Sequence, residues 1–226
     1  MCVIGLSGFA GAGKSTVAEY LVRQHGFVRL SFGAAVKDIT AAAFAWDRQR
    51  LEGATPQDRA WREQSDDFWS ERMGKPFTPR YALQYLGTDI FRDHVLPTIW
   101  ADLVVAKIRR LGPGANVVID DVRFVNEREA LRKEGATFVL LRREDFPTQL
   151  HQQLWTTARG GFSIRGIEPS NGLHPSEWDW LRDTTVADDT EILNHGSYDD
   201  LYAAVDEWWY NRSQDSTSVH EVMHVS

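Results

Sequence analysis

The sequence predicts an α/β fold in which a five-stranded parallel sheet is flanked by helices. Short, β-branched apolar runs alternate with segments of helical spacing along most of the 226 residues. The first of these runs ends in a glycine-rich turn that leads directly into a helical segment. Ligands of such sheets bind outside the carboxyl ends of the strands. We therefore expect the functional site at that edge.

Each expected element follows from the spacing of its apolar residues. Continuous short runs predict buried strands, whereas apolar residues three and four apart predict helices. The expected strands are MCVIGLSG (1–8), FVRLSF (27–32), ANVVIDDVRF (115–124), TFVLLRR (137–143) and TEILNHG (190–196). The expected helices occupy 14–24, 34–44, 79–93 with a break near Gly87, 99–112, 125–135 and 198–211. Gly26 and Gly135 should end two of them, because glycine readily adopts the left-handed conformation found after helices.

Two segments interrupt the alternation. Residues 46–97 mix charged and aromatic side chains without a long clean period, which predicts an insertion of helices and loops. Residues 143–187 are rich in glycine and too long for an ordinary loop, so we expect a mobile lid. Both segments should belong to one domain covering residues 1–211, followed by a flexible polar tail at 212–226.

The composition argues against several classes of protein. A formal net charge of −7 disfavours a general nucleic-acid binder, which is usually basic. Cys2 is the only cysteine, so no internal disulfide is expected and a reducing compartment is favoured. No apolar run approaches the ~18 residues of a membrane span, and no signal peptide is apparent. We therefore expect a cytoplasmic protein (in the host cytoplasm if the chain is viral) without a nucleic-acid or membrane partner.

The segment GFAGAGKST matches the pattern G-x-x-x-x-G-K-[ST] between an expected strand and an expected helix. Its glycines let the backbone turn so that several N–H groups face one anion, and the positive end of the helix adds to the attraction. Lys14 should reach the β- and γ-phosphates, while the Ser15 hydroxyl should coordinate Mg²⁺. The residues predicted to bind a nucleoside triphosphate are Gly8, Gly11, Ala12, Gly13, Lys14, Ser15 and Thr16.

The loop by itself does not decide what happens to the triphosphate. A GTPase would normally carry Asn-Lys-x-Asp, and the sequence has no such tetrapeptide. A transport ATPase usually ends an apolar strand in Asp-Glu, whereas here a strand ends in Asp120 and Asp121, followed by Arg123. The acids could hold a metal, and the arginine after them could bind a second, anionic substrate. This arrangement suits transfer to such a substrate better than attack by water. The residues therefore favour phosphoryl transfer.

Three further motifs carry a family resemblance. RYALQYLGTDIFRD (80–93), VVIDDVRFVNERE (117–129) and HPSEWDW (174–180), together with the glycine loop, resemble the bacteriophage deoxynucleoside monophosphate kinases. The resemblance implies a P-loop kinase fold with an acceptor-binding insertion and a lid. It also implies transfer of the ATP γ-phosphate to a deoxynucleoside monophosphate, with ATP and Mg²⁺, and it leaves a homodimer open.

Two alternatives to this activity stay open. One is a kinase of another phosphorylated metabolite, of the phosphomevalonate or dephospho-coenzyme A type. The other is a regulatory protein that uses nucleotide hydrolysis only as a switch. Transfer of labelled phosphate to a panel of acceptors separates these alternatives from a deoxynucleotide kinase.

The candidate acceptor-binding residues come from several parts of the chain. Arg123 either pairs with the preceding acids or clamps the acceptor phosphate in a bidentate fork. Asp121 matches an acid in the family's Asp-Val-Arg-Phe motif, and Lys37 matches a basic residue that faces the acceptor phosphate in the resembling kinases. The predicted substrate-binding set is Lys37, Arg80, Gln84, Thr88, Arg92, Asp121, Arg123, His174 and Glu177.

Positive charge should surround the migrating phosphoryl group, because its transition state spreads negative charge over three oxygens. The predicted catalytic residues are Lys14, Arg123, Arg142 and Arg143. The metal ligands are predicted to be Ser15 and Asp120, although the sequence does not separate Asp120 from Asp121 for this role. A phosphate-monoester acceptor is already an anion, so no general base is expected.

Overall fold

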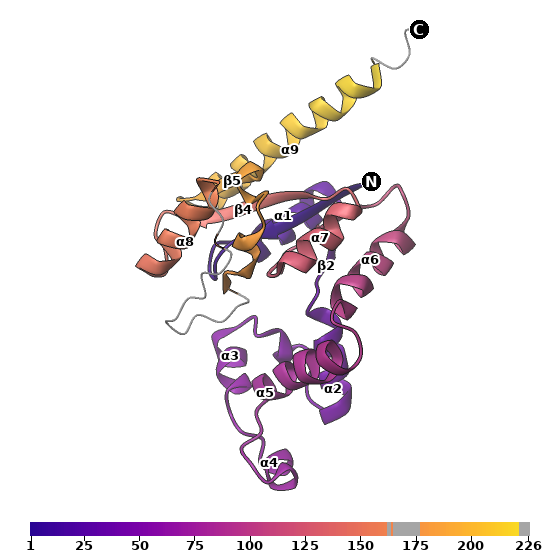
Figure 1. The fold of residues 1–226 in the computed structure, drawn as a ribbon, viewed down its shortest axis with the longest axis vertical. Helices are drawn as coiled ribbons and strands as arrows, with labels where there is room; N and C mark the ends of the chain where they lie inside the picture. The colour runs from indigo at the N-terminus through magenta and orange to yellow at the C-terminus, as the bar shows by residue number, and fades with distance from the viewer. Residues whose placement is uncertain (162–163, 165–176, 222–226) are drawn as a thin grey trace. The chain divides into compact units, whose positions relative to one another are not determined.

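The computed structural model describes residues 1–161, 164 and 177–221, with side chains described as far as Arg212. The chain forms two compact units, coloured along the sequence in Figure 1. Unit 1 comprises Met1–Arg29 and Gly112–Ser226, and unit 2 comprises Leu30–Leu111. Unit 2 is therefore wider than the insertion expected at 46–97, because it also contains the helices on either side of that segment.

A five-stranded sheet forms the centre of unit 1. Its strands are β1 (Cys2–Ser7), β2 (Val28–Leu30), β3 (Asn116–Ile119), β4 (Thr137–Arg143) and β5 (Thr190–Asn194). The strand order is β2-β3-β1-β4-β5. β1 pairs in parallel with β3 and with β4, and β4 pairs in parallel with β5. The predicted five-stranded parallel sheet is thus confirmed.

Helices cover both faces of this sheet. The helices of unit 1 are α1 (Lys14–His25), α7 (Val125–Lys133), α8 (Gln149–Arg159), η4 (Asp179–Arg182), η5 (Val186–Asp188) and α9 (Tyr198–Glu221). Successive residues of a strand point to opposite faces. Accordingly, Val139 and Leu141 of β4 pack with α1 and α9, whereas Leu140 between them packs with α8, η4 and η5. This double cover explains why the buried residues of β3 and β4 are apolar.

Two segments of unit 1 contain more helix than the sequence indicated. The segment expected as a mobile lid (143–187) contains the eleven-residue helix α8, which packs through Leu154 and Trp155. The final helix α9 continues to Glu221, so the tail expected from residue 212 onward is helical over 212–221. Apolar burial stabilises α8 more than its local sequence indicates. Among the described residues, no helix is both long and apolar enough to cross a lipid bilayer.

Unit 2 is helical. Its elements are α2 (Ala34–Phe44), η1 (Arg50–Glu52), α3 (Pro56–Arg62), α4 (Asp67–Met73), α5 (Pro79–Gln84), η2 (Tyr85–Arg92) and α6 (Ile99–Leu111). Side-chain caps begin the short helices: Thr55 accepts a hydrogen bond from Asp58 N, and Asp66 accepts one from Trp69 N. Phe44, Phe77 and Ala82 form their apolar centre. Short helices joined by loops thus occupy residues 46–97.

The helix expected to break near Gly87 continues instead as the π-helix η2. Glycine weakens an α-helix, but the wider i→i+5 hydrogen bonding accommodates it without a break. A Cβ at Gly87 would lie 3.3 Å from Val36 of α2, so glycine permits close packing here. Its carbonyl accepts a hydrogen bond from the indole nitrogen of buried Trp100 at 2.9 Å.

Candidate active site

The glycine-rich loop connects β1 to α1, at the carboxyl end of the sheet. Gly8, Gly11 and Gly13 adopt φ angles of 146°, 79° and 101°. These angles are disfavoured for residues with a Cβ, so the loop requires glycine at all three positions. Ala12, within the loop, is buried. Lys14 opens α1, which places the loop at the positive end of that helix.

Gly8 and Gly11 should respond differently to a methyl group. A Cβ at Gly8 would lie only 2.2 Å from the carbonyl oxygen of Leu141, whereas a Cβ at Gly11 would have no neighbour within 4 Å. We expect Gly8→Ala to displace the loop and abolish triphosphate binding. Gly11→Ala should cost about 1–2 kcal/mol, from its backbone conformation alone. Equilibrium binding of a fluorescent triphosphate measures both effects, and equal losses in the two variants would contradict this account.

The Lys14 side chain folds back over the loop. Its Nζ donates hydrogen bonds to the carbonyl oxygens of Gly8 at 2.7 Å and Phe9 at 2.9 Å. Burial lowers the pKa of Lys14 to about 8, and the positive charge of Arg123 contributes further. The lysine ammonium is therefore held close to the position where the loop would bind a phosphate. Desolvation and a neighbouring cation make its charge costly until an anion arrives.

This lowered pKa predicts proton uptake on nucleotide binding. A triphosphate beside Lys14 should raise the pKa again, so that binding takes up about half a proton per site at pH 8. Affinity should consequently fall as the pH rises through 8. Calorimetric titrations in buffers of different ionisation enthalpy measure the uptake. Lys14→Met should abolish it, and an uptake unaffected by that substitution would contradict the assignment.

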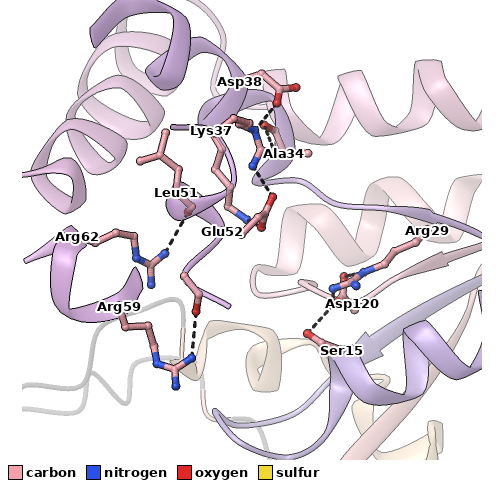
Figure 2. A network of polar contacts seen from close by, with 12 residues as sticks. Ser15, Arg29, Ala34, Lys37, Asp38, Leu51, Glu52, Arg59, Arg62 and Asp120 are labelled. Carbon is pink, nitrogen blue, oxygen red and sulfur yellow. Dashed lines mark hydrogen bonds and ion pairs between the residues drawn. The ribbon is translucent and has the colours of Figure 1, made fainter. Parts of the chain in front are cut away.

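Ser15 and Asp120, the two predicted metal ligands, lie in direct contact (Figure 2). The Ser15 hydroxyl donates a hydrogen bond to Oδ2 of Asp120 at 2.8 Å. Asp120 is only 6% exposed, at the end of β3. Asp121 is half-buried beside it. The contact with Ser15 therefore distinguishes Asp120 from Asp121, which the sequence could not do.

A third residue, Arg29 of β2, completes this cluster and was missed by sequence reasoning. Its Nε and Nη2 donate to the two carboxylate oxygens of Asp120, at 3.1 and 2.5 Å. Such a bidentate fork fixes the carboxylate plane as well as its position. The only sequence signal for this role was that Arg29 is a charged residue inside the short apolar run FVRLSF.

The oxygen atoms of Ser15 and Asp120 fit a hard cation. Mg²⁺ in phosphoryl-transfer sites takes one or two protein oxygens and completes its octahedron with water and phosphate. A hydroxyl and a carboxylate in contact supply that set. Arg29 leaves lone pairs of the Asp120 carboxylate available, because each oxygen can accept more than one hydrogen bond.

Asn194 was also missed, and it supports the loop from the end of β5. Its Nδ2 donates to the carbonyl oxygen of Ala12 at 3.1 Å. A Cβ at Gly13 would lie 2.7 Å from the same nitrogen. The amide thus holds the loop where only glycine fits. A single asparagine at a strand end carries no recognisable sequence signal.

The predicted catalytic arginines have different surroundings. The Arg123 side chain is exposed and makes no ion pair with Asp120, Asp121 or any other described residue. Arg142 donates from Nε to Glu191 at 2.6 Å, so its charge is already partly neutralised. Arg143 is exposed and lines, together with Arg142, a pocket that borders the glycine loop. The alternative in which Arg123 pairs with the neighbouring acids does not hold in this structure.

The two remaining unit 1 candidates concern the expected lid. Glu177 Oε2 lies 3.5 Å from Nε2 of buried His151. The His151 ring packs edge-on against Phe9 of the glycine loop, with a centroid distance of 4.6 Å. Glu177 therefore contacts a residue that supports the loop. His174 lies outside the described residues.

Within unit 2, two predicted basic residues already have carboxylate partners. Lys37 Nζ lies 2.5 Å from Glu52, and Arg80 Nε lies 2.5 Å from Glu63. Figure 2 shows Lys37 and Glu52 facing each other. Although burial raises the pKa of Glu52, hydrogen bonds from Lys37 and Arg48 lower it overall. The Lys37 charge is thus balanced locally.

The other three unit 2 candidates follow one another along a continuous helical stretch. Gln84 ends α5, and it shares that helix with Arg80, as their four-residue spacing predicted. Thr88 and Arg92 lie on the π-helix η2. Gln84 and Thr88 are exposed, whereas Arg92 is half-buried.

Comparison with known proteins identifies similar sequences. A sequence profile described as deoxynucleotide monophosphate kinase matches residues 57–160. A protein of Acanthamoeba polyphaga mimivirus, provisionally named deoxynucleotide monophosphate kinase, is 33% identical over 153 residues. The alignment covers 63% of this chain and 75% of the viral protein.

Solved structures with a similar arrangement include kinases. The dephospho-CoA kinase from Campylobacter jejuni shares 12% identity with a TM-score of 0.45, over 95% of this chain and 98% of that one. TT1252 from Thermus thermophilus shares 20% identity with a TM-score of 0.44, over 93% of this chain and 97% of that one.

Proposed function

Because the chain belongs to the deoxynucleotide monophosphate kinase family, we propose that it transfers the γ-phosphate of ATP to a deoxynucleoside monophosphate, giving the diphosphate for DNA precursor synthesis. Family membership makes the chain a kinase, and hence a phosphotransferase. The match over residues 57–160 carries the proposal for the acceptor. It includes most of the insertion as well as the Asp120–Arg123 strand end, where the acceptor residues were predicted.

On the donor side, the glycine loop supplies main-chain N–H groups for the ATP phosphates. The loop geometry supports this, since its left-handed glycines and the start of α1 are arranged as an anion site requires. Lys14 would turn from the loop carbonyls to the β- and γ-phosphates. Ser15 and Asp120 would hold Mg²⁺, and the bound ion would neutralise charge on the phosphate oxygens.

On the acceptor side, Arg123 is the residue best supported by the structure. Its guanidinium is exposed, has no ion-pair partner among the described residues, and is near enough to Lys14 to lower the pKa of that lysine. A phosphate is the anion that such a planar fork binds well. Asp121, Thr88 and Glu177 remain predicted acceptor residues.

The transfer step needs no proton acceptor. An oxygen of the acceptor phosphate attacks the γ-phosphorus, the bond to the β–γ bridging oxygen breaks, and ADP leaves. Lys14 and Arg123 stabilise the charge that spreads over the transferred group, and a metal ion held by Ser15 and Asp120 would supply further positive charge. Arg142 and Arg143 remain predicted contributors, with Arg143 the more available of the two because Arg142 pairs with Glu191. Exclusion of water from the site favours transfer to the acceptor over hydrolysis of ATP.

Incubation with γ-labelled ATP and a panel of acceptors tests the proposal. Label transferred to deoxynucleoside monophosphates supports it. Transfer only to another phosphorylated metabolite, such as phosphomevalonate or dephospho-coenzyme A, would replace it with the first alternative. Release of free phosphate without any transfer would favour a nucleotide-hydrolysing regulatory protein.

Replacing Arg123 should chiefly impair use of the acceptor. Because a hydrogen bond to a charged group contributes about 1.5–3 kcal/mol, Arg123→Ala should lower kcat/KM for the acceptor by about 10- to 100-fold. The KM for ATP should change little. Initial rates with each substrate varied in turn measure this. Arg23→Ala, which removes an exposed arginine at the far end of α1, is the control and should behave like the wild type.

A further inference from the structure

Three arginines of unit 2 form a cationic group that the sequence motifs do not single out as a whole. We call Arg59, Arg62 and Arg80 the arginine cluster. Arg59 and Arg62 project from α3, and Arg80 from the first turn of α5. Neither Arg59 nor Arg62 was predicted as a site residue. Both extend from the same helix in Figure 2.

Arg62 is held in place without a carboxylate. Its Nη1 donates one long hydrogen bond to the carbonyl oxygen of Leu51, at 3.4 Å. Its Nε is buried and has no hydrogen-bond partner among the described residues. A guanidinium has five N–H donors, and leaving a buried donor unsatisfied costs about 1–3 kcal/mol. The Arg62 side chain therefore keeps a hydrogen-bond donor that a bound ligand could satisfy.

The backbone beside Arg62 is shaped to admit its guanidinium. Gly53 adopts a φ of 65°, and a Cβ there would lie 2.5 Å from Cζ and from Nη2 of Arg62. The carbonyls of Gly53 and Ala54 each accept a hydrogen bond from Nη1 of Arg59, at 3.0 Å. One short turn thus positions two arginine side chains through main-chain atoms, and neither makes an ion pair with a carboxylate among the described residues.

Charges of both signs surround Arg62. Burial lowers the pKa of its guanidinium, and the positive charges of Arg80 and Arg59 lower it further, whereas the carboxylates of Glu63 and Glu52 raise it. Lys37 is balanced by Glu52, and Arg80 by Glu63. The Arg80–Glu63 pair is exposed on both sides, so it contributes little and Arg80 can exchange its partner. An anion bound to Arg62 would relieve this repulsion and satisfy unused donors.

We propose that Arg62, with Arg59 beside it, is a binding residue for the phosphate of the acceptor, and that Arg80 joins it by leaving Glu63. The identity of the acceptor rests on the proposed function, whereas the binding of a tetrahedral anion does not. Arg62 thereby replaces Lys37 as the principal phosphate-binding residue of unit 2. A phosphomonoester suits it because two of its oxygens match the guanidinium fork.

Kinetics of Arg62 variants test the inference. Arg62→Ala should raise the KM for the deoxynucleoside monophosphate by about 10- to 100-fold, as expected for a charge-assisted hydrogen bond, while leaving the KM for ATP within about two-fold. The acceptor KM of Arg62→Lys should lie between those of the wild type and Arg62→Ala, because lysine retains the charge but lacks the planar guanidinium fork. Arg72→Ala removes an exposed arginine of the same unit outside the cluster and should not alter either KM.

A binding measurement without turnover complements the kinetics. Sulfate, a tetrahedral dianion, should stabilise the wild type against thermal unfolding and should compete with the acceptor. Arg62→Ala should lose that part of the stabilisation. A deoxynucleoside without phosphate should inhibit wild type and Arg62→Ala equally, which shows that the residue binds phosphate and not the base. Melting temperatures without sulfate verify that each variant folds.

Gly53→Ala provides a second route to the same site. Its methyl group would occupy the place of the Arg62 guanidinium and displace that side chain without removing it. The variant should therefore raise the acceptor KM, like Arg62→Ala, in a chain that retains every arginine.

The outcomes separate the inference from the proposed function. If deoxynucleotides are phosphorylated and their KM is unchanged in Arg62→Ala and Arg62→Lys, the inference is overturned and the function stands. If the wild type phosphorylates no deoxynucleotide, the proposed function fails. In that case the sulfate comparison still decides whether Arg62 binds an anion. If sulfate stabilises the wild type and Arg62→Ala equally, the inference about Arg62 is overturned.

Discussion

Lys14→Ala should lower kcat for phosphoryl transfer by about 10²–10³-fold, since removing one preorganised stabiliser of transition-state charge typically has that effect. The ammonium is the cation best placed in the glycine loop, 2.7 Å from the Gly8 carbonyl. Nucleotide binding should weaken as well, because the loop carbonyls lose the donor that now organises them. Single-turnover rates with labelled ATP separate the two effects.

Two further variants show whether the loss of rate comes specifically from the Lys14 ammonium group. Lys14→Arg retains a positive charge but places a wide planar group where a compact ammonium fits, so it should recover little of the rate. Lys133→Ala removes an exposed lysine at the end of α7 and should leave the rate unchanged. A Lys14→Ala enzyme with more than about a tenth of wild-type kcat would contradict the role in transfer, given the expected 10²–10³-fold loss.

Arg128→Met should destabilise the protein by about 3–5 kcal/mol, because it removes one partner from a buried ionic network. Arg128 is fully buried on α7, and its Nε lies 2.6 Å from Asp183. Its Nη2 lies 2.5 Å from Asp189, and its guanidinium stacks on the ring of Phe138 at 4.0 Å. Without Arg128 the Asp189 carboxylate would be buried without this partner. The urea concentration at half-unfolding measures the loss.

A variant that removes the whole network provides the decisive comparison. Arg128→Met combined with Asp183→Asn and Asp189→Asn removes all three buried charges of this network, so it should regain most of the lost stability. Arg132→Met, which removes the half-exposed second partner of Asp183, should cost much less than Arg128→Met. A loss under about 1 kcal/mol for Arg128→Met would show that the network does not hold the structure together, because a broken buried pair costs several times that amount.

The same network gives stability a dependence on low pH. Burial raises the pKa of Asp183, but hydrogen bonds from Arg128, Arg132 and Thr185 outweigh it and hold the pKa far below its usual value. This contribution is present above the unfolded value of 3.8 and is lost as the pH falls through the lower folded value. For Asp189, burial outweighs Arg128 and raises the pKa.

Much of the fold was predictable from local spacing. The helix expected at 34–44 and the strand expected at 137–143 have those bounds in the structure, because each is a continuous apolar or helix-favouring run. The helix α8 was not predicted, since the glycine-rich sequence that follows it concealed the apolar face that Leu154 and Trp155 bury. The π-helix at Gly87 was missed for a similar reason: a local helix-breaking signal was overridden by packing on Val36.

For the candidate site, the sequence by itself determined the glycine loop, because a motif of adjacent residues encodes its conformation directly. It also determined the acids and the arginine that follow the third strand. Only the tertiary structure decided which acid contacts Ser15, a residue 105 positions away, and brought Arg29 to that same carboxylate. It likewise decided that Lys37 is balanced by Glu52, whereas Arg62 makes no ion pair with any described residue. The physical reason is that a charge is satisfied by whatever lies within a few ångströms in space, and separation along the chain does not specify that distance.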